Sequence, residues 1–133
     1  MAIILVVDDD ADVITTIKKS LTRAGYQVTC ASTSHAALQM LSSQRPNLVL
    51  LDIAMPGIDG IELCRQLRAN PSTASLPILF LTVSGDMQSK TAAFNAGADD
   101  YLVKPFDLQE LNLRVKALLL REEPGTFVDH AAI

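Results

Sequence analysis

Three aspartates, one threonine and one lysine each follow a short apolar segment of the chain: Asp8 and Asp9, Asp52, Thr82 and Lys104. If these segments are parallel strands, their carboxyl ends meet at one edge of a sheet. Three carboxylates within a few ångströms of one another cannot all stay ionised without compensating positive charge. Lys104 offers one charge, and Mg²⁺ or Mn²⁺, which prefer oxygen ligands, would offer the rest. A carboxylate in such surroundings can accept a phosphoryl group as a nucleophile.

Each of these residues also has an ordinary structural interpretation. Asp8 or Asp9 alone could begin a turn, and Asp52 alone could form a turn or cap a helix. Thr82 could be a loop hydroxyl and Lys104 an exposed charge. Taken singly, these interpretations are sufficient, but their coincidence at four strand ends favours one shared site.

Other kinds of catalytic site have little support. A Ser-His-Asp triad, a Cys-His pair or a histidine metal site would need His35 or His130, and both are interpreted as solvent-exposed. Cys30 and Cys64 are too few and too far apart for a disulfide scaffold or a zinc site, and both are expected to be buried thiols. The chain has no P-loop or GxGxxG motif, so nucleotide binding is not indicated.

The apolar segments alternate with amphipathic helical patterns. The segments are nearly continuous runs of Val, Ile and Leu, which is typical of strands buried on both faces of a sheet. They cover Ile3–Val7, Tyr26–Cys30, Leu48–Leu51, Ile78–Leu81 and Tyr101–Val103. Apolar residues at helical spacing predict helices over 13–24, 36–41, 61–67, 87–96 and 108–119. All six prolines lie outside these elements.

Polar residues at the starts of these helices are candidate caps. Asp10 or Asp12 is expected to cap the first helix, and one of residues 32–34 the second. The third helix is entered through Asp59, and the fifth starts after Asp107.

Five strand–helix units predict an α/β fold: a doubly wound, five-stranded parallel sheet with helices on both faces. A closed eight-stranded barrel would need about twice this chain of 133 residues. We expect one domain over residues 1–121, followed by a tail or the start of a linker over 122–133. A docked terminal segment anchored by Phe127 and Val128 is the alternative.

Composition limits the choice of partners. Lys plus Arg number 11 and Asp plus Glu number 15, for a net charge of −4, which argues against nucleic-acid binding by this domain. The sequence lacks an apolar stretch of about 18 residues, so a membrane span does not fit. Its first apolar run is not preceded by positively charged residues, so a signal peptide does not fit either. A cytoplasmic domain is expected.

Four motifs occur in order along the chain. They are Ile-Leu-Val-Val-Asp8-Asp9, Leu-Val-Leu-Leu-Asp52-Ile-Ala-Met-Pro56-Gly57-Ile-Asp59-Gly60, Leu81-Thr82, and Gly97-Ala98-Asp99-Asp100-Tyr101-Leu102-Val103-Lys104-Pro105-Phe106. Through them the chain resembles a response-regulator receiver domain of two-component signal transduction, over about residues 3–121. The resemblance implies a flavodoxin-like sheet with strand order 2-1-3-4-5.

The resemblance also implies a metal site. Asp52 would be the phosphoacceptor and a ligand of Mg²⁺ (or Mn²⁺). Asp9 would bind the ion directly and Asp8 mainly through water, while the backbone carbonyl of Ala54 would complete the protein ligands.

Further residues are implied to bind the phosphoryl group and to act as a switch. Thr82 and Lys104 would each contact a phosphoryl oxygen, and Lys104-Pro105 would be a cis peptide. Tyr101 would act as the switch by changing rotamer as Thr82 moves. The alternative interpretation is that Tyr101 only packs against the edge of the sheet. The surface of helix 87–96, the fifth strand and the fifth helix would be remodelled as a result.

Three positions near the site depart from the family pattern or vary within it. Val83 follows Thr82 where the family mostly has Ala or another small residue, and its branched side chain could narrow phosphodonor access or restrain Thr82. Ala54 and Ser84 stand at positions that tune acyl-phosphate hydrolysis in the family, and both are small and neutral here. We hypothesise that neither directs the attacking water strongly.

The implied function is a phosphorylation-dependent switch rather than an enzyme, with at most self-catalysed phosphotransfer and autodephosphorylation. Its implied partners are a histidine kinase or histidine phosphotransfer protein and an output partner or domain, and a homodimer linked to phosphorylation is compatible with this role. One alternative is a magnesium-dependent aspartyl-phosphate phosphatase, although Ala54 stands where such an enzyme has its acid. A pseudo-receiver that only mediates contacts is the other.

Overall fold

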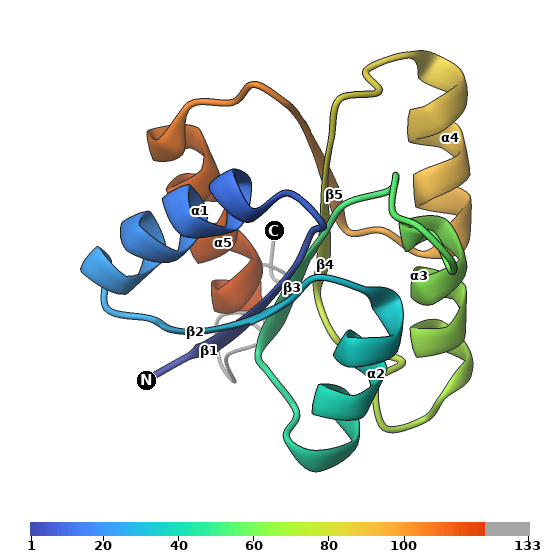
Figure 1. The fold of residues 1–133 in the computed structure, drawn as a ribbon, viewed down its shortest axis with the longest axis horizontal. Coiled ribbons are helices and arrows are strands. Elements are labelled where there is room, and N and C mark those ends of the chain that lie inside the picture. Colours follow the sequence, from blue (N-terminus) through green and yellow to red (C-terminus); the bar gives the residue numbers. More distant parts are fainter. Residues whose placement is uncertain (122–133) are drawn as a thin grey trace, which may run out of the picture.

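Five short apolar segments form one parallel sheet in the computed structural model (Figure 1). The strands are β1 (Ile3–Val7), β2 (Gln27–Ala31), β3 (Leu48–Leu51), β4 (Ile78–Thr82) and β5 (Asp100–Val103). Their order across the sheet is β2-β1-β3-β4-β5. The strand order expected from the resemblance is therefore confirmed.

Five helices cover the two faces of this sheet. They are α1 (Ala11–Arg23), α2 (Ser34–Ser43), α3 (Gly60–Ala69), α4 (Met87–Ala96) and α5 (Leu108–Arg121). In Figure 1, α1 and α5 lie on one side of the sheet, and α2, α3 and α4 lie on the other. The doubly wound architecture expected from the alternating pattern is confirmed.

The core consists of two aliphatic layers, one on each face. In β1, Leu5 and Val7 pack with residues of α2, α3 and α4, while Ile4 and Val6 pack with residues of α1 and α5. All four side chains are at most 1% exposed. Because both faces are covered, the strands are continuous apolar runs, as strands of parallel sheets usually are.

Side-chain caps set the starts of the helices. The carboxylate of Asp10 accepts hydrogen bonds from the Asp12 and Val13 amides, and Thr33 accepts one from the Ala36 amide. Asp10 rather than Asp12 is thus the cap of α1. Asp59 likewise caps α3. At the start of α5, Asp107 accepts a 2.7 Å hydrogen bond from the Gln109 amide.

The main differences from expectation concern the edge strand β2. It begins and ends one residue later than predicted. Cys30 is half-buried rather than buried, because an edge strand lacks a neighbour on one side.

Cys64 is buried as predicted and donates a 3.3 Å hydrogen bond to the Ala96 carbonyl. Burial raises the pKa of both thiols. His35 is exposed, as predicted.

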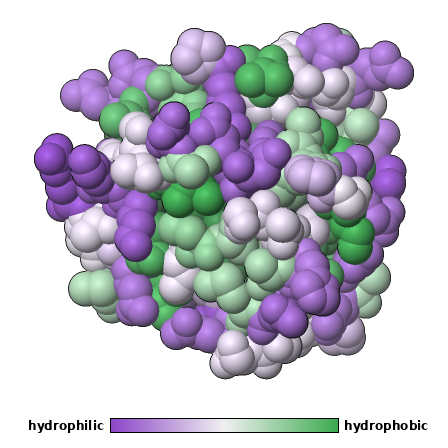
Figure 2. All heavy atoms as spheres, viewed as in Figure 1, coloured by the Kyte–Doolittle hydropathy of each residue, from purple (hydrophilic) through white to green (hydrophobic). Residues whose placement is uncertain are grey.

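The structure describes residues 1–121, so the predictions for the tail over 122–133 and for His130 lie outside it. None of the helices in the described part has both the length and the apolar character needed to cross a lipid bilayer. The face shown in Figure 2 carries hydrophilic residues at its margins and a more hydrophobic area between them. Exposed apolar side chains on α4 and α5 include Met87, Phe94 and Leu113.

Candidate functional site

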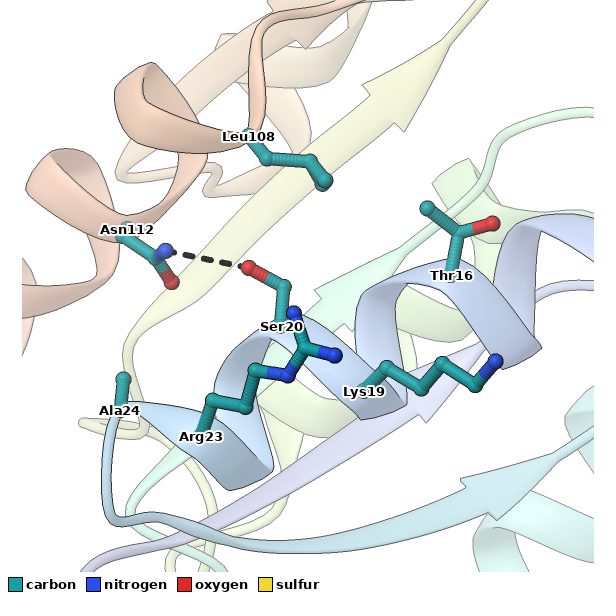
Figure 3. Close-up of a pocket in the computed structure, with 7 residues that line it drawn as sticks. All are labelled: Thr16, Lys19, Ser20, Arg23, Ala24, Leu108 and Asn112. Atoms are coloured by element: carbon teal, nitrogen blue, oxygen red, sulfur yellow. Dashed lines mark hydrogen bonds between the residues drawn. The ribbon is translucent and has the colours of Figure 1, made fainter.

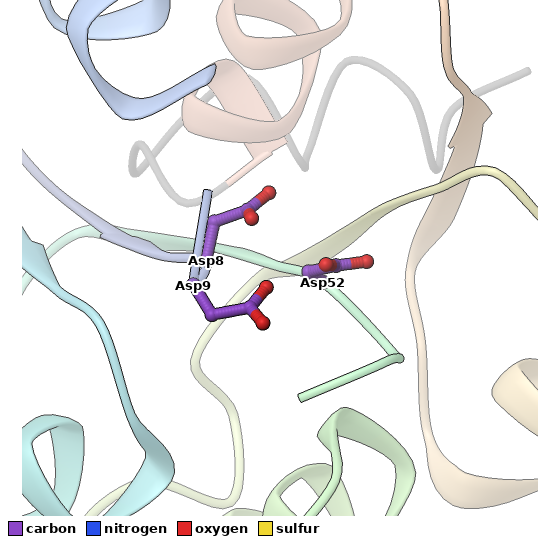
Figure 4. Close-up of side chains that lie close together, drawn as sticks. All are labelled: Asp8, Asp9 and Asp52. Atoms are coloured by element: carbon purple, nitrogen blue, oxygen red, sulfur yellow. The ribbon is translucent and has the colours of Figure 1, made fainter. Parts of the chain in front are cut away.

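Three predicted aspartates meet where β1 and β3 end. Asp8 and Asp52 are buried, whereas Asp9 is exposed, and the carboxylates of Asp8 and Asp9 both point to the side where Asp52 lies (Figure 4). One carboxylate oxygen from each residue lies within 4.8 Å of the others. The sequence prediction that these carboxylates converge is thus matched by their positions.

The register of the sheet explains why Asp8 and Asp52 are neighbours. Val7 pairs with Leu51, and each is the last residue of its strand, so the next residue on each strand leaves the sheet at the same level. The Asp52 amide donates a 3.0 Å hydrogen bond to the Val7 carbonyl. The Asp8 amide donates one of 3.1 Å to the Ala31 carbonyl on the other side.

Lys104 brings positive charge to these carboxylates from the end of β5. Its ammonium group lies 2.6 Å from an Asp8 oxygen and 3.5 Å from an Asp52 oxygen. The Lys104 amide donates a 2.8 Å hydrogen bond to the Thr82 carbonyl, which fixes the backbone at this point. The following peptide bond to Pro105 is cis.

The environment of Asp52 opposes its ionisation. Burial raises the pKa of this carboxyl group above its ordinary value, and the nearby Asp8 charge raises it further. Lys104 and the Ile53 amide offset part of this effect. The uncompensated negative charge is the reason that a divalent cation would be favourable here.

The donor set suits a hard cation. Asp8, Asp9 and Asp52 offer only oxygen atoms, without the sulfur or imidazole that zinc and copper sites use. Mg²⁺ binds through one or two carboxylates and keeps several waters, and exposed Asp9 leaves room for solvent on one side. The residues present therefore fit Mg²⁺ or Mn²⁺.

Thr82 and Tyr101 are linked through the segment that follows β4. Thr82 is 1% exposed, and its hydroxyl oxygen accepts a 3.3 Å hydrogen bond from the Ser84 amide. The Tyr101 hydroxyl donates to the Ser84 carbonyl. Tyr101 is buried, its ring centroid lies 6.5 Å from that of Phe94, and the Lys90 ammonium lies 5.9 Å from the same ring. Burial and the Asp86 charge raise the pKa of Tyr101.

Two residues beside the site, Ala54 and Val83, are exposed to solvent. Ala54, whose carbonyl is a predicted metal ligand, is exposed in the segment after β3. Val83 is 69% exposed and lines a hollow together with Lys104, Pro105 and α1 residues such as Val13. Its influence on phosphodonor access stays a prediction.

Gly60 is a motif residue to which the sequence analysis assigned no role. A Cβ atom at this position would lie 2.1 Å from the Asp52 carbonyl oxygen and 2.9 Å from the Ile53 Cα atom. The Gly60 amide also donates a 2.9 Å hydrogen bond to the Ile53 carbonyl. The absence of a side chain thus lets α3 start directly against the backbone of Asp52. Its position after a helix-capping aspartate was the available signal.

A separate hollow between α1 and α5 shares no residue with the aspartate cluster (Figure 3). There the Asn112 amide donates a 3.1 Å hydrogen bond to the Ser20 hydroxyl, and Lys19 and Arg23 lie at the α1 side. Its lining contains no carboxylate, so it offers no alternative phosphoacceptor.

Known proteins resemble this chain in sequence and structure. A model of the response regulator receiver domain matches residues 4–116. Response regulator MprA of Mycobacterium avium (strain 104) is 48% identical over 130 residues, which cover 98% of this chain and 56% of that protein. The chain therefore spans about half the length of the curated relatives it matches.

Two solved structures lead to the same family. A signal receiver domain of a signal transduction histidine kinase from Syntrophus aciditrophicus is 32% identical with a TM-score of 0.88, covering 93% of this chain and 94% of that one. A two-component response regulator from Clostridium difficile is 33% identical with a TM-score of 0.86, covering 91% and 98%. The resemblance carried by the four sequence motifs is thus confirmed, and the chain belongs to the response regulator receiver domain family.

Proposed function

We propose that this receiver domain is a phosphorylation-dependent switch, in which Asp52 accepts a phosphoryl group from a histidine kinase or histidine phosphotransfer protein. The observation that carries the proposal is the position of Lys104, whose ammonium lies 2.6 Å from Asp8 and 3.5 Å from Asp52 at the carboxyl edge of the sheet. A carboxylate beside a lysine and further acidic oxygens is suited to phosphoryl transfer, where charge neutralisation is the main requirement.

In the proposed transfer, a carboxylate oxygen of Asp52 attacks the phosphorus atom of the donor. A P–O bond to Asp52 forms as the P–N bond to the donor histidine breaks, and the departing nitrogen keeps the electron pair. Lys104 would neutralise one phosphoryl oxygen, and the Thr82 hydroxyl would donate to another. Hydrolysis of the acyl phosphate by water would return the domain to its starting state.

The proposed metal ligands are Asp8, Asp9, Asp52 and the backbone carbonyl of Ala54. Asp9 would bind the ion directly and Asp8 mainly through water. Bound Mg²⁺ (or Mn²⁺) supplies positive charge for the oxygens of the transferred group. The three side chains support this assignment because their oxygens lie within 4.8 Å of one another.

The proposed switch runs through the segment that joins Thr82 to α4. Phosphorylation adds up to about two negative charges and three acceptor oxygens. Movement of the Thr82 hydroxyl toward them would lengthen the 3.3 Å hydrogen bond that it accepts from the Ser84 amide. The Ser84 carbonyl in turn accepts from the Tyr101 hydroxyl. A move of this segment would free Tyr101 to change rotamer. The surface formed by α4, β5 and α5 would then favour a second pre-existing state.

The partners are proposed from the same role. Residues 1–121 would form the receiver domain, and residues 122–133 would be a tail or lead to an output region. The α4–β5–α5 surface would contact an output partner or domain, or a second copy of the chain after phosphorylation. The domain would act in the cytoplasm as a signalling module, and its chemistry would be limited to its own phosphorylation and dephosphorylation.

Reaction with a small phosphodonor tests the proposal. Intact protein is incubated with acetyl phosphate and Mg²⁺ and its mass is measured, with Asp52→Asn as the matched variant. The proposal predicts one added phosphoryl group in the wild-type protein and none in the variant. An unmodified wild-type protein that hydrolyses p-nitrophenyl phosphate would indicate a phosphatase instead, and one with neither property would indicate a contact module.

A further inference from the structure

Ser34 is a buried polar residue that lies outside the aspartate cluster. The residue is 2% exposed, and its hydroxyl donates a 2.7 Å hydrogen bond to the carbonyl of Ile58, 24 residues later. It does not cap its own helix, because Thr33 does so through the Ala36 amide. Its hydrogen bond therefore serves to hold a distant segment against the start of α2.

The segment that Ser34 holds is the loop over residues 53–59, which joins Asp52 to α3. The loop is closed at its base by the 2.9 Å hydrogen bond from the Gly60 amide to the Ile53 carbonyl. Within the loop, Met55 is 8% exposed and packs into the hydrophobic core. Ser34 adds a second attachment of the loop at Ile58, two residues before Gly60. The loop thus has a defined position although much of it is exposed.

The start of α2 is itself fixed to the other side of the aspartate cluster. Strand β2 ends at Ala31, three residues before Ser34, and the Ala31 carbonyl accepts a 3.1 Å hydrogen bond from the Asp8 amide. The residues from Ala31 to Ser34 therefore connect the end of β1, which carries Asp8, with the loop that follows Asp52.

We propose that Ser34 is a positioning residue for the metal site, which sets the distance between the end of β1 and the loop that carries the Ala54 carbonyl. The inference rests on the proposed function, because it uses the proposed ligand role of Ala54. Mg²⁺ demands nearly ideal octahedral geometry, so a small displacement of one ligand lowers affinity before it alters the fold. Residues that orient metal ligands typically change affinity 10–100-fold when they are replaced.

A pair of matched variants tests this role. Ser34→Ala removes the hydroxyl that reaches the loop. Thr73→Val removes another buried hydroxyl, from a residue that is 5% exposed and donates a 2.6 Å hydrogen bond to Leu67. Thr73 lies in the connection before β4, at the edge of the sheet opposite Asp52. Each change removes one hydrogen bond from a buried hydroxyl to a backbone carbonyl, although the Leu67 carbonyl keeps a 3.3 Å hydrogen bond from the Asn70 amide. A loss of stability of the same order is therefore expected in the two variants.

Mg²⁺ binding to the full chain is measured by isothermal titration calorimetry, well below the unfolding temperature of each variant in EDTA. We expect the Kd to rise about tenfold in Ser34→Ala and to stay at the wild-type value in Thr73→Val. Ser34→Cys keeps a side chain of similar shape with a weak donor, so its Kd should be intermediate. This variant also supplies the answer if Ser34→Ala does not fold.

The possible failures can be told apart. If the wild-type protein binds no Mg²⁺, the proposed metal site itself is wrong. If it binds Mg²⁺ and the Ser34 variants have the wild-type Kd, the positioning role is wrong and the proposed function stands. An equal rise in the Thr73→Val variant would make the effect one of general stability and would also overturn the role of Ser34.

Discussion

The Lys104 ammonium donates a 2.6 Å hydrogen bond to the carboxylate of Asp8, a residue 96 positions earlier in the chain. The side chain of Lys104 is 13% exposed and that of Asp8 is 2% exposed, so water screens this pair only weakly. A carboxylate oxygen of Asp52 lies 3.5 Å from the same ammonium group. One lysine therefore compensates two buried carboxylates, and its removal should affect both stability and phosphoryl transfer.

Replacement of this lysine, Lys104→Gln, should lower the free energy of unfolding by about 2–3 kcal/mol, because two buried carboxylates lose their positive partner. Urea unfolding in EDTA measures the effect, with exposed Lys116→Gln as the control. The control should change stability by no more than about 0.5 kcal/mol. Equal stability of the two variants would show that the Lys104 pair contributes nothing.

The Asp52→Asn variant should be more stable than the wild-type protein at neutral pH in EDTA. Burial and the Asp8 charge raise the pKa of Asp52, so the folded protein holds this proton more tightly than the unfolded chain. Wild-type stability from this group therefore increases as the pH falls toward the raised pKa. Thermal unfolding at several pH values should show the advantage of the variant shrinking in that direction. An advantage that grows on acidification would contradict the prediction.

Magnesium should raise the unfolding temperature of the wild-type protein, because an ion that binds the folded state stabilises it by about 2.7 kcal/mol at a hundred times its Kd. Asp9→Asn should abolish this effect with little change in the metal-free protein, since Asp9 is exposed. Asp12→Asn, another exposed position nearby, is the control and should keep the full response. Thermal scans with MgCl₂ and with EDTA test this, and an undiminished response in the Asp9 variant would exclude Asp9 as a ligand.

Gly60→Ala should destabilise the protein by about 2 kcal/mol or more, because the new Cβ would meet the Asp52 carbonyl oxygen at 2.1 Å. Gly85→Ala is the matched control, since its Cβ would meet only the Val103 side chain, at 3.3 Å, and a shift of a few tenths of an ångström relieves that contact. Chemical unfolding of both variants measures the difference. Similar stability of the two would mean that α3 can shift away from Asp52 without cost.

The fold and the approach of the aspartates to one another could be predicted because they depend on local patterns. Apolar runs, helical spacing and proline positions define the elements, and parallel strands bring their carboxyl ends to one edge. The residue after each strand end, such as Asp8, Asp52 or Lys104, then has a predictable place.

Other features depend on contacts that sequence spacing does not encode. Ser34 looked like one of three candidate caps, and its hydrogen bond to Ile58 depends on how α2 and the loop after β3 pack. The close approach of Gly60 to Asp52 likewise depends on the position of α3. The half-burial of Cys30 follows from the place of β2 at the sheet edge, which the strand order expected from the resemblance implies but the apolar pattern of that strand alone does not reveal.

The central claim is that Asp52 is the residue that carries the phosphoryl group. Borohydride reduces an acyl phosphate of aspartate to a homoserine side chain, and peptide mass spectrometry then locates the change. After reaction with acetyl phosphate and Mg²⁺, we predict reduction at residue 52 and at no other aspartate, and none when Mg²⁺ is replaced by EDTA. Reduction at Asp8 or Asp9, or an unmodified residue 52 in protein that has gained a phosphoryl group, would contradict the account.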